Sequence, residues 1–201
     1  MKSITSNEIN FVLQILKNPK HDYNANSISK ELGISSMGAL KIAKKLEKEN
    51  ILVSRKLGKA VFYSINYKSD YSIQYIHFIL KKQAEQSNPY IKRWISEIMK
   101  IKNSDIAILF GSVLSKHDKA NDIDVLFVAS QKNFSELKKE IENINRLNDK
   151  KIHPVYQSKQ DLIENINKED KVILNAIKGI VVFGEDIFLD SVKKWARQRI
   201  N

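Results

Sequence analysis

Residues 109–128 read LFGSVLSKHDKANDIDVLFV, and this stretch decides the fold of the C-terminal part of the chain. The apolar runs 106–110 and 125–129, at its two ends, have the length and composition of buried β-strands. The pattern therefore predicts two neighbouring strands with a short connection.

The connection begins and ends with residues suited to phosphate chemistry. Gly111 and Ser112 follow the first run, and after a gap of nine residues Asp122 and Asp124 lead into the second. Two acids two positions apart on a strand project their carboxylates from one face, where they suit Mg²⁺. A glycine lets the backbone approach a phosphate, and Ser112 can open a helix whose first amides and hydroxyl face it. These are the parts needed for phosphoryl or nucleotidyl transfer.

The Gly-Ser pair, the gap and the Asp-x-Asp strand resemble the nucleotidyltransferase superfamily of DNA polymerase β, in particular its minimal stand-alone members. Residues 179–185, GIVVFGE, resemble the closing strand and turn of such members, so the resemblance covers about residues 90–190. It implies an α/β domain with a mixed sheet and flanking helices. It also implies transfer of a nucleoside monophosphate from a nucleoside triphosphate, with ATP the expected one, to an acceptor hydroxyl, with Mg²⁺ as cofactor.

The resemblance assigns roles by position. The two aspartates would be catalytic and would hold the metal, while Gly111 and Ser112 would bind the nucleotide. Active members often carry an arginine shortly after Gly-Ser. Here Lys116 or Lys119 is expected to neutralise the triphosphate instead.

One departure concerns the third carboxylate, which the family supplies from a neighbouring strand as metal ligand and base. The matching segment, residues 151–156, reads KIHPVY and contains no acid. His153 has the expected position, and imidazole can act as a base although it is a poorer Mg²⁺ ligand than carboxylate. Asp149, just before the strand, is the alternative in a different register. The sequence does not decide between His153 and Asp149 as the residue that completes the site. A weakened or lost reaction is one expected consequence of the missing acid.

The N-terminal third has helical periodicity. Residues 7–18 carry apolar side chains on one side and end before a proline. A short helix over 27–32 ends at Gly33, which suits a left-handed helix stop. A third helix begins after Ser35 or Ser36 and continues to about residue 50. Two helices joined by a glycine-containing turn form a helix-turn-helix pattern.

The third helix and the segment after it are basic. Lys41, Lys44, Lys45 and Lys48 fall within one arc of the helix, a row that can reach phosphates. Segments 51–56 and 60–66 then predict a hairpin with basic residues near its tip. This order resembles the winged-helix DNA-binding family over residues 7–66. It implies that the partner is duplex DNA and that a homodimer binds two half-sites. The alternative function of this fold is to dock onto another protein. The DNA-binding residues would be Ser36, Lys41, Lys44, Lys45, Lys48, Arg55, Lys56 and Lys59.

Composition limits the protein's class. The net charge is +11, which favours polyanionic partners. The absence of cysteine excludes disulfides and thiolate sites and fits the cytoplasm, while the short apolar runs predict no membrane segment. We therefore expect an α+β protein of two domains: a winged helix over 1–67, a linker helix over 68–88 and a minimal nucleotidyltransferase-like domain over 89–201.

Three functions follow from these two domains. The first is a DNA-binding nucleotidyltransferase whose acceptor hydroxyl lies on a protein, a small molecule or RNA. Some minimal members are antitoxins that modify a partner toxin, which makes a protein acceptor attractive. The second is a non-enzymatic transcriptional regulator in which a degenerate nucleotidyltransferase fold senses nucleotide or mediates oligomerisation. The third is an RNA-modifying enzyme whose winged helix grips RNA.

Overall fold

The computed structural model describes residues 4–197, which form two compact units. One unit is built on residues up to Leu80 and the other on Lys81–Trp195. No helix within the described residues is both long enough and apolar enough to cross a membrane.

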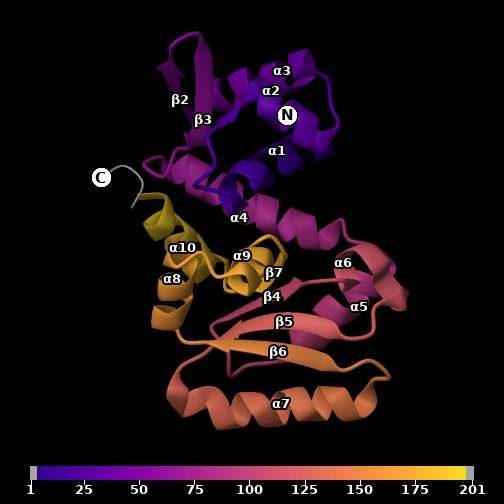
Figure 1. The fold of residues 1–201 in the computed structure, drawn as a ribbon. Helices are drawn as coiled ribbons and strands as arrows, with labels where there is room; N and C mark the ends of the chain where they lie inside the picture. Colours follow the sequence, from indigo (N-terminus) through magenta and orange to yellow (C-terminus); the bar gives the residue numbers. More distant parts are fainter. Residues whose placement is uncertain (1–3, 198–201) are drawn as a thin grey trace. The chain divides into compact units, whose positions relative to one another are not determined.

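The first unit is a winged helix (Figure 1). Three helices and three strands make up the motif, and the sheet has the antiparallel order β1-β3-β2. In chain order these elements are α1 (Ser6–Lys17), β1 (Tyr23–Asn24), α2 (Ala25–Leu32), α3 (Ser36–Lys48), β2 (Leu52–Leu57) and β3 (Ala60–Ile65).

Local signals set the ends of these helices. The Thr5 hydroxyl accepts from the Glu8 amide, and the Glu8 carboxylate accepts from the Thr5 amide, so α1 begins with a capping box. Gly33 ends α2 at φ +64°, a left-handed conformation that costs glycine little. Ser35 caps α3 through the Gly38 amide. The turn between α2 and α3 is thus determined locally, as the helix-turn-helix pattern predicts.

The linker helix of the sequence analysis is α4 (Asp70–Glu85). Its buried residues include Tyr75, Ile76, Ile79 and Leu80. The division between the units falls within this helix, after Leu80.

The second unit is an α/β domain with a mixed four-stranded sheet of order β6-β5-β4-β7. Strands β5 and β6 are parallel, whereas β4 is antiparallel to both its neighbours. The elements are α5 (Pro89–Ile98), β4 (Ile106–Phe110), α6 (Val113–Lys116), the 3-10 turns η1 (His117–Lys119) and η2 (Gln131–Asn133), β5 (Ile123–Val128), α7 (Phe134–Leu147), β6 (Ile152–Gln157), α8 (Lys159–Asn167), α9 (Lys171–Ile177), β7 (Ile180–Phe183) and α10 (Glu185–Arg197).

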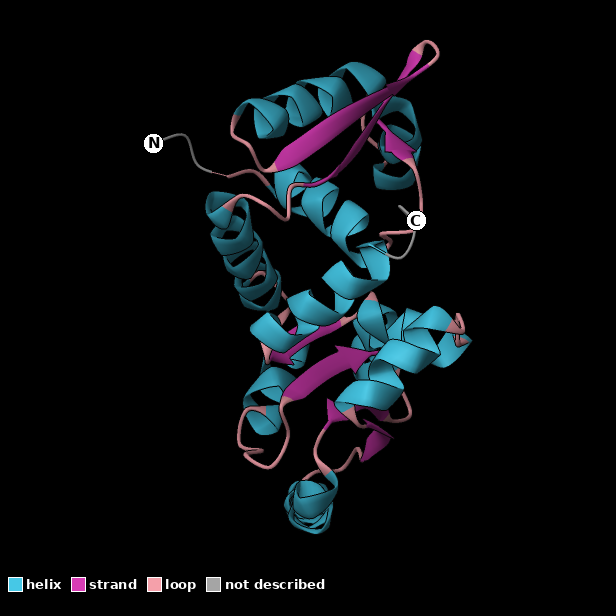
Figure 2. Cartoon of the chain, turned by 90° about the vertical axis from the view of Figure 1, so that its left-hand side faces the viewer, coloured by secondary structure: helices cyan, strands magenta, loops and turns pink. Residues whose placement is uncertain are grey.

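Helices cover both faces of this sheet (Figure 2). On one face, Trp94 of α5 and Ile141 of α7 pack with Val125 and Phe127 of β5 in a single apolar cluster. On the other face, α9 packs against β4. Because both sides are covered, all five residues of β4 are buried. The pairing of β4, β5 and β6 therefore sets which residues lie side by side at the ends of these strands.

Candidate functional site

Three side chains with metal-binding atoms meet at one end of β5 and β6. Asp122 immediately precedes β5, Asp124 is its second residue, and His153 lies opposite Asp124 in the parallel register of β6. One ligand atom from each lies within 4.8 Å of the others. His153 Nδ1 is 3.1 Å from Asp124 Oδ1. The sequence prediction that both carboxylates share one face of the strand agrees with this arrangement.

Gly111 packs directly against this cluster. It follows Phe110, which pairs with Asp124 across the antiparallel β4–β5 ladder. Its φ is +78°, and a Cβ atom there would lie 2.1 Å from Asp124 Oδ2. Two independent constraints therefore require glycine: the backbone conformation and the space that the carboxylate occupies. The sequence analysis anticipated a close approach to phosphate but not this contact with Asp124.

The connection after Gly111 is short, and a hydrogen bond joins it to the start of α5. Ser112 precedes α6 and makes no side-chain cap hydrogen bond, and Lys116 is the exposed last residue of that helix. His117 has φ +53°, which is rare for a residue with a side chain. The Asn88 Oδ1 accepts from the Ile91 amide at the start of α5, which leaves its Nδ2 to donate to His117 Nδ1 at 2.7 Å. The hydrogen bond between Asn88 and His117 was not predicted from the sequence.

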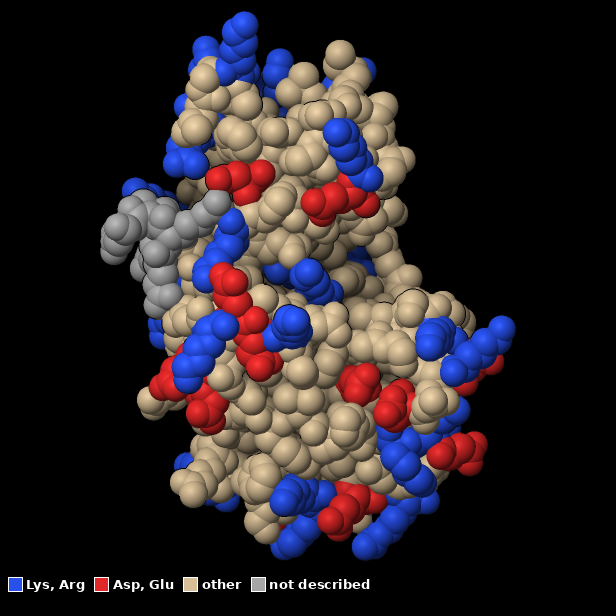
Figure 3. Space-filling model, in the orientation of Figure 1, with Lys and Arg blue, Asp and Glu red and all other residues tan. Residues whose placement is uncertain are grey.

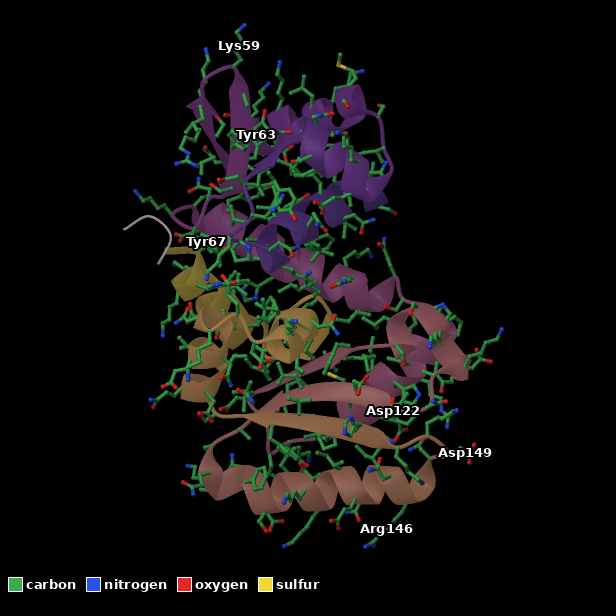
Figure 4. All side chains as sticks on the ribbon, in the orientation of Figure 1. Lys59, Tyr63, Tyr67, Asp122, Arg146 and Asp149 are labelled. Carbon is green, nitrogen blue, oxygen red and sulfur yellow. The ribbon has the colours of Figure 1, made fainter. Side chains whose placement is uncertain are left out.

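The two candidates for the third position are placed differently. His153 joins the aspartates, whereas Asp149 lies in the loop before β6 and is not part of the cluster (Figure 4). Among the described residues, this cluster contains no third acid. Its donor set is two carboxylates and one imidazole.

This donor set only partly fits Mg²⁺. The side chains of Asp124 and His153 are 23% and 68% exposed, so a bound cation would keep positions open to water or phosphate oxygens. The carboxylates are ligands that Mg²⁺ prefers, but an imidazole nitrogen is not. The site fits a divalent cation as a class better than it fits Mg²⁺ in particular.

Three of the four lysines in the predicted DNA-binding row lie exposed on one face of α3. Lys41, Lys44 and Lys48 are exposed at spacings of three and four residues, so they share one face of the helix. Lys45 departs from the row, because its Nζ donates to Glu8 Oε1 of α1. This contact raises the pKa of Lys45 and anchors α3 to α1. Within the described residues, Lys45 therefore has a structural partner that the other three lysines of the predicted row lack, and its role in DNA binding stays a prediction.

Ser36 also has structural partners. Its hydroxyl lies 3.2 Å from the Asn26 Oδ1 and 3.2 Å from the Ser29 Oγ, both on α2. The residue is nevertheless exposed at the start of α3, next to Met37, whose side chain is 62% exposed. The start of α3 thus combines a fixed hydroxyl with an accessible apolar side chain.

The wing presents the remaining predicted basic residues. Arg55 and Lys56 on β2 and Lys59 in the turn are all exposed. Lys59 lies at the tip of the hairpin and points away from it (Figure 4). Lysine and arginine side chains gather around the hairpin tip (Figure 3). Arg55 lies 3.6 Å from the exposed carboxylate of Asp22, a weak surface pair that leaves the guanidinium accessible.

Comparison with known families adds one finding for the second unit. Residues 93–186 match the family model described as polymerase beta, nucleotidyltransferase. These residues form a nucleotidyltransferase-type domain. The match includes Gly111, Ser112, both aspartates and His153. The prediction of a nucleotidyltransferase-type fold with a mixed sheet for this part of the chain is therefore confirmed.

The other comparisons contribute less. A search of curated proteins finds no significant match. Among solved structures, the zinc-responsive MarR family member ZitR of Lactococcus lactis is 14% identical, with TM-score 0.30, covering 50% of this chain and 74% of that one. The adhesin competence repressor AdcR of Streptococcus pyogenes is 13% identical, with TM-score 0.29, covering 49% and 79%. The assignment of a winged helix follows from the order and pairing of the elements in the first unit.

Proposed function

We propose that the second unit transfers a nucleoside monophosphate from a nucleoside triphosphate, ATP in the first instance, to an acceptor hydroxyl. The observation that carries this proposal is the packing of Gly111 against Asp124 within the Asp122, Asp124 and His153 cluster. A bound divalent cation would supply positive charge to the phosphates, and the sequence analysis expects Mg²⁺ in that role.

The chain's own groups divide the remaining work. The hydroxyl of Ser112 and the ammonium group of Lys116 would contact the β- and γ-phosphates. Ser112 immediately precedes the short helix after Gly111, and Lys116 is the last residue of that helix. The acceptor oxygen would attack the α-phosphorus and form the new P–O bond. The bond to pyrophosphate would break, and pyrophosphate would leave with the electron pair. The proton of the acceptor hydroxyl would pass to a carboxylate oxygen of Asp124 that the cation leaves free.

We further propose that the first unit binds duplex DNA as a homodimer. Lys41, Lys44 and Lys48 would contact the phosphates that border the major groove, and Met37 and Ser36 at the start of α3 would lie nearest the bases. The wing residues Arg55, Lys56 and Lys59 would contact the neighbouring backbone or minor groove. Lys45 is left out because Glu8 engages it.

Nucleotidyl transfer is tested with α- and γ-labelled ATP, GTP, CTP and UTP and a divalent cation. Wild-type protein should release pyrophosphate and retain the α-label on an acceptor. Asp124→Asn should lose this turnover by more than about a hundredfold, because it removes charge from the centre of the cluster. Asp118→Asn is the matched control, since Asp118 is an exposed acid in the same connection but outside the cluster. Equal turnover by wild type and Asp124→Asn would contradict the proposal.

A second candidate function is a non-enzymatic regulator that senses nucleotide. The absence of a third acid in the cluster, among the described residues, favours it. Nucleotide binding that requires Asp124, with no release of pyrophosphate in the presence of protein, RNA and small-molecule acceptors, would support the sensor over the enzyme. RNA binding tighter than duplex DNA binding at matched salt would favour RNA as the partner of the winged helix.

A further inference from the structure

The cluster at the start of β5 and β6 departs from its family in one chemical respect. Where the resemblance leads one to expect an acid, the structure places a histidine ring in direct contact with Asp124. This is not a chance approach of a long side chain. Asp124 and His153 are paired in the parallel register of two hydrogen-bonded strands, so their side chains leave the sheet on the same side.

The spacing of the atoms suits joint coordination. Two ligands at right angles on one cation, each at about 2.1–2.2 Å, lie about 3 Å apart. The observed separation of His153 Nδ1 and Asp124 Oδ1 is 3.1 Å. The Asp122 carboxylate lies within 4.8 Å of both, which a shared ion can bridge after small side-chain rotations. The side chain of His153 is 68% exposed, so the cluster is open to solvent.

The kind of donor determines which ion this set prefers. Mg²⁺ binds oxygen ligands and gains little from nitrogen, whereas Mn²⁺, Co²⁺ and Zn²⁺ accept imidazole together with carboxylate. Replacing one carboxylate by a neutral imidazole also lowers the negative charge of the site. The binding of a hard ion such as Mg²⁺ depends mainly on charge, so its affinity falls most when the negative charge is reduced. Both effects weaken Mg²⁺ relative to the transition-metal ions.

We infer that Asp122, Asp124 and His153 form a binding site for a transition-metal divalent cation of the Mn²⁺–Zn²⁺ class, with His153 as a direct ligand, and that this site discriminates against Mg²⁺. The inference deepens the proposed function and rests on it for its biological meaning. Its readout is metal binding without nucleotide, so the failure of either proposal can be recognised separately.

The test uses the full chain and Mn²⁺ as the probe. The electron paramagnetic resonance signal of free Mn²⁺ reports the bound fraction, and ¹⁴N coupling of the bound ion reports a nitrogen ligand. Wild-type protein should bind Mn²⁺ with ¹⁴N coupling, and a tenfold excess of Mg²⁺ should not displace it. His153→Asp should abolish the coupling and allow Mg²⁺ to compete. His153→Ala should weaken Mn²⁺ binding on the order of ten- to a hundredfold, comparable to losses of a metal site's supporting groups.

Two controls separate the site from general effects. His21→Gln changes an exposed histidine of the first unit, whose ring is tilted by 53° against that of Tyr23 and lies outside the cluster. This variant should leave Mn²⁺ binding unchanged. Asp124→Asn should abolish binding. The inference is overturned if wild type binds no Mn²⁺, if it binds Mg²⁺ as tightly as Mn²⁺, or if the ¹⁴N coupling is absent or survives in His153→Asp.

Discussion

The two units present their candidate sites in opposite ways. In the winged helix, charge is spread over exposed ends of long side chains on α3 and the wing. In the nucleotidyltransferase-type domain, three short side chains meet within 4.8 Å, and one of them packs on a glycine. A distributed site loses affinity gradually as charges are removed. In a packed cluster, a change to a single side chain is expected to cause a large loss.

The largest expected effect is that of Gly111→Ala. The new methyl group would meet the Asp124 carboxylate, and alanine is also disfavoured at φ +78°. We expect nucleotide turnover to fall by more than about a hundredfold, since the cluster must shift. Pyrophosphate release and thermal unfolding, measured on the same preparation, provide the check.

A matched control for this change lies in the wing. Gly58 also has a positive φ, +58°, but a Cβ there would meet nothing within 4 Å. Gly58→Ala should therefore cost only the backbone penalty of about 1–2 kcal/mol and leave turnover unchanged. Comparable losses of turnover in the two variants would contradict the special role of the Gly111–Asp124 contact.

Charge reversal on α3 should have the next largest effect. Lys41→Glu combined with Lys44→Glu places two acids on the exposed face of the helix. Affinity for duplex DNA should fall on the order of a hundredfold at low salt, because phosphate contacts are replaced by repulsion. Each lost contact should reduce the slope of log affinity against log salt by about 0.9. Turnover without DNA should stay at the wild-type level, and a parallel loss would argue against separate roles for the two units.

The neighbouring residues Lys44 and Lys45 offer a finer comparison. Lys44→Gln should weaken DNA binding and leave stability unchanged, since Lys44 is exposed. Lys45→Gln should do the reverse and lower the free energy of unfolding by about 1–2 kcal/mol, because the nearly buried Glu8 carboxylate loses its charged partner. Urea unfolding and DNA titrations on both variants measure these effects. A larger loss of DNA affinity in Lys45→Gln than in Lys44→Gln would show that Lys45 contacts DNA together with the other three lysines.

The smallest effect is a pH dependence at Glu8. Burial raises the pKa of this carboxyl, but hydrogen bonds from Lys45 and the Thr5 amide outweigh it and leave the pKa below its ordinary value. A carboxyl with a lowered pKa in the folded state stabilises the protein above its unfolded pKa, and this contribution is lost as the pH falls through the folded value. The stability difference between wild type and Glu8→Gln should therefore shrink as the pH falls below about 4.5. A constant difference down to pH 3 would contradict this account.

The sequence predicted most of the architecture because its signals are local. Caps and apolar spacing placed helices over 7–18 and 27–32, close to the observed α1 and α2. The spacing of Gly111, Asp122 and Asp124 identified the nucleotidyltransferase-type domain. By contrast, β1 has only two residues and depends on pairing with β3, so no local pattern marks it. The sequence analysis also did not predict α8 and α9.

Within the sites, the sequence missed contacts between distant residues. The helical arc of α3 included Lys45 because its partner Glu8 lies 37 residues earlier in the chain. The contact of Gly111 with Asp124 depends on the pairing of Phe110 with Asp124, a register that spacing alone does not determine. The alternatives His153 and Asp149 are distinguished by the same kind of information, since only the β5–β6 register places His153 opposite Asp124.

The central claim is that one unit binds DNA while the other binds nucleotide through the Asp122, Asp124 and His153 cluster. The most direct test measures both activities on wild type, Asp124→Asn and the Lys41→Glu, Lys44→Glu double variant. Labelled ATP binding with Mn²⁺ and duplex DNA affinity would be determined in parallel. The account predicts that Asp124→Asn loses only nucleotide binding and the double variant loses only DNA binding. Nucleotide binding that survives in Asp124→Asn, or DNA binding that survives in the double variant, would contradict it.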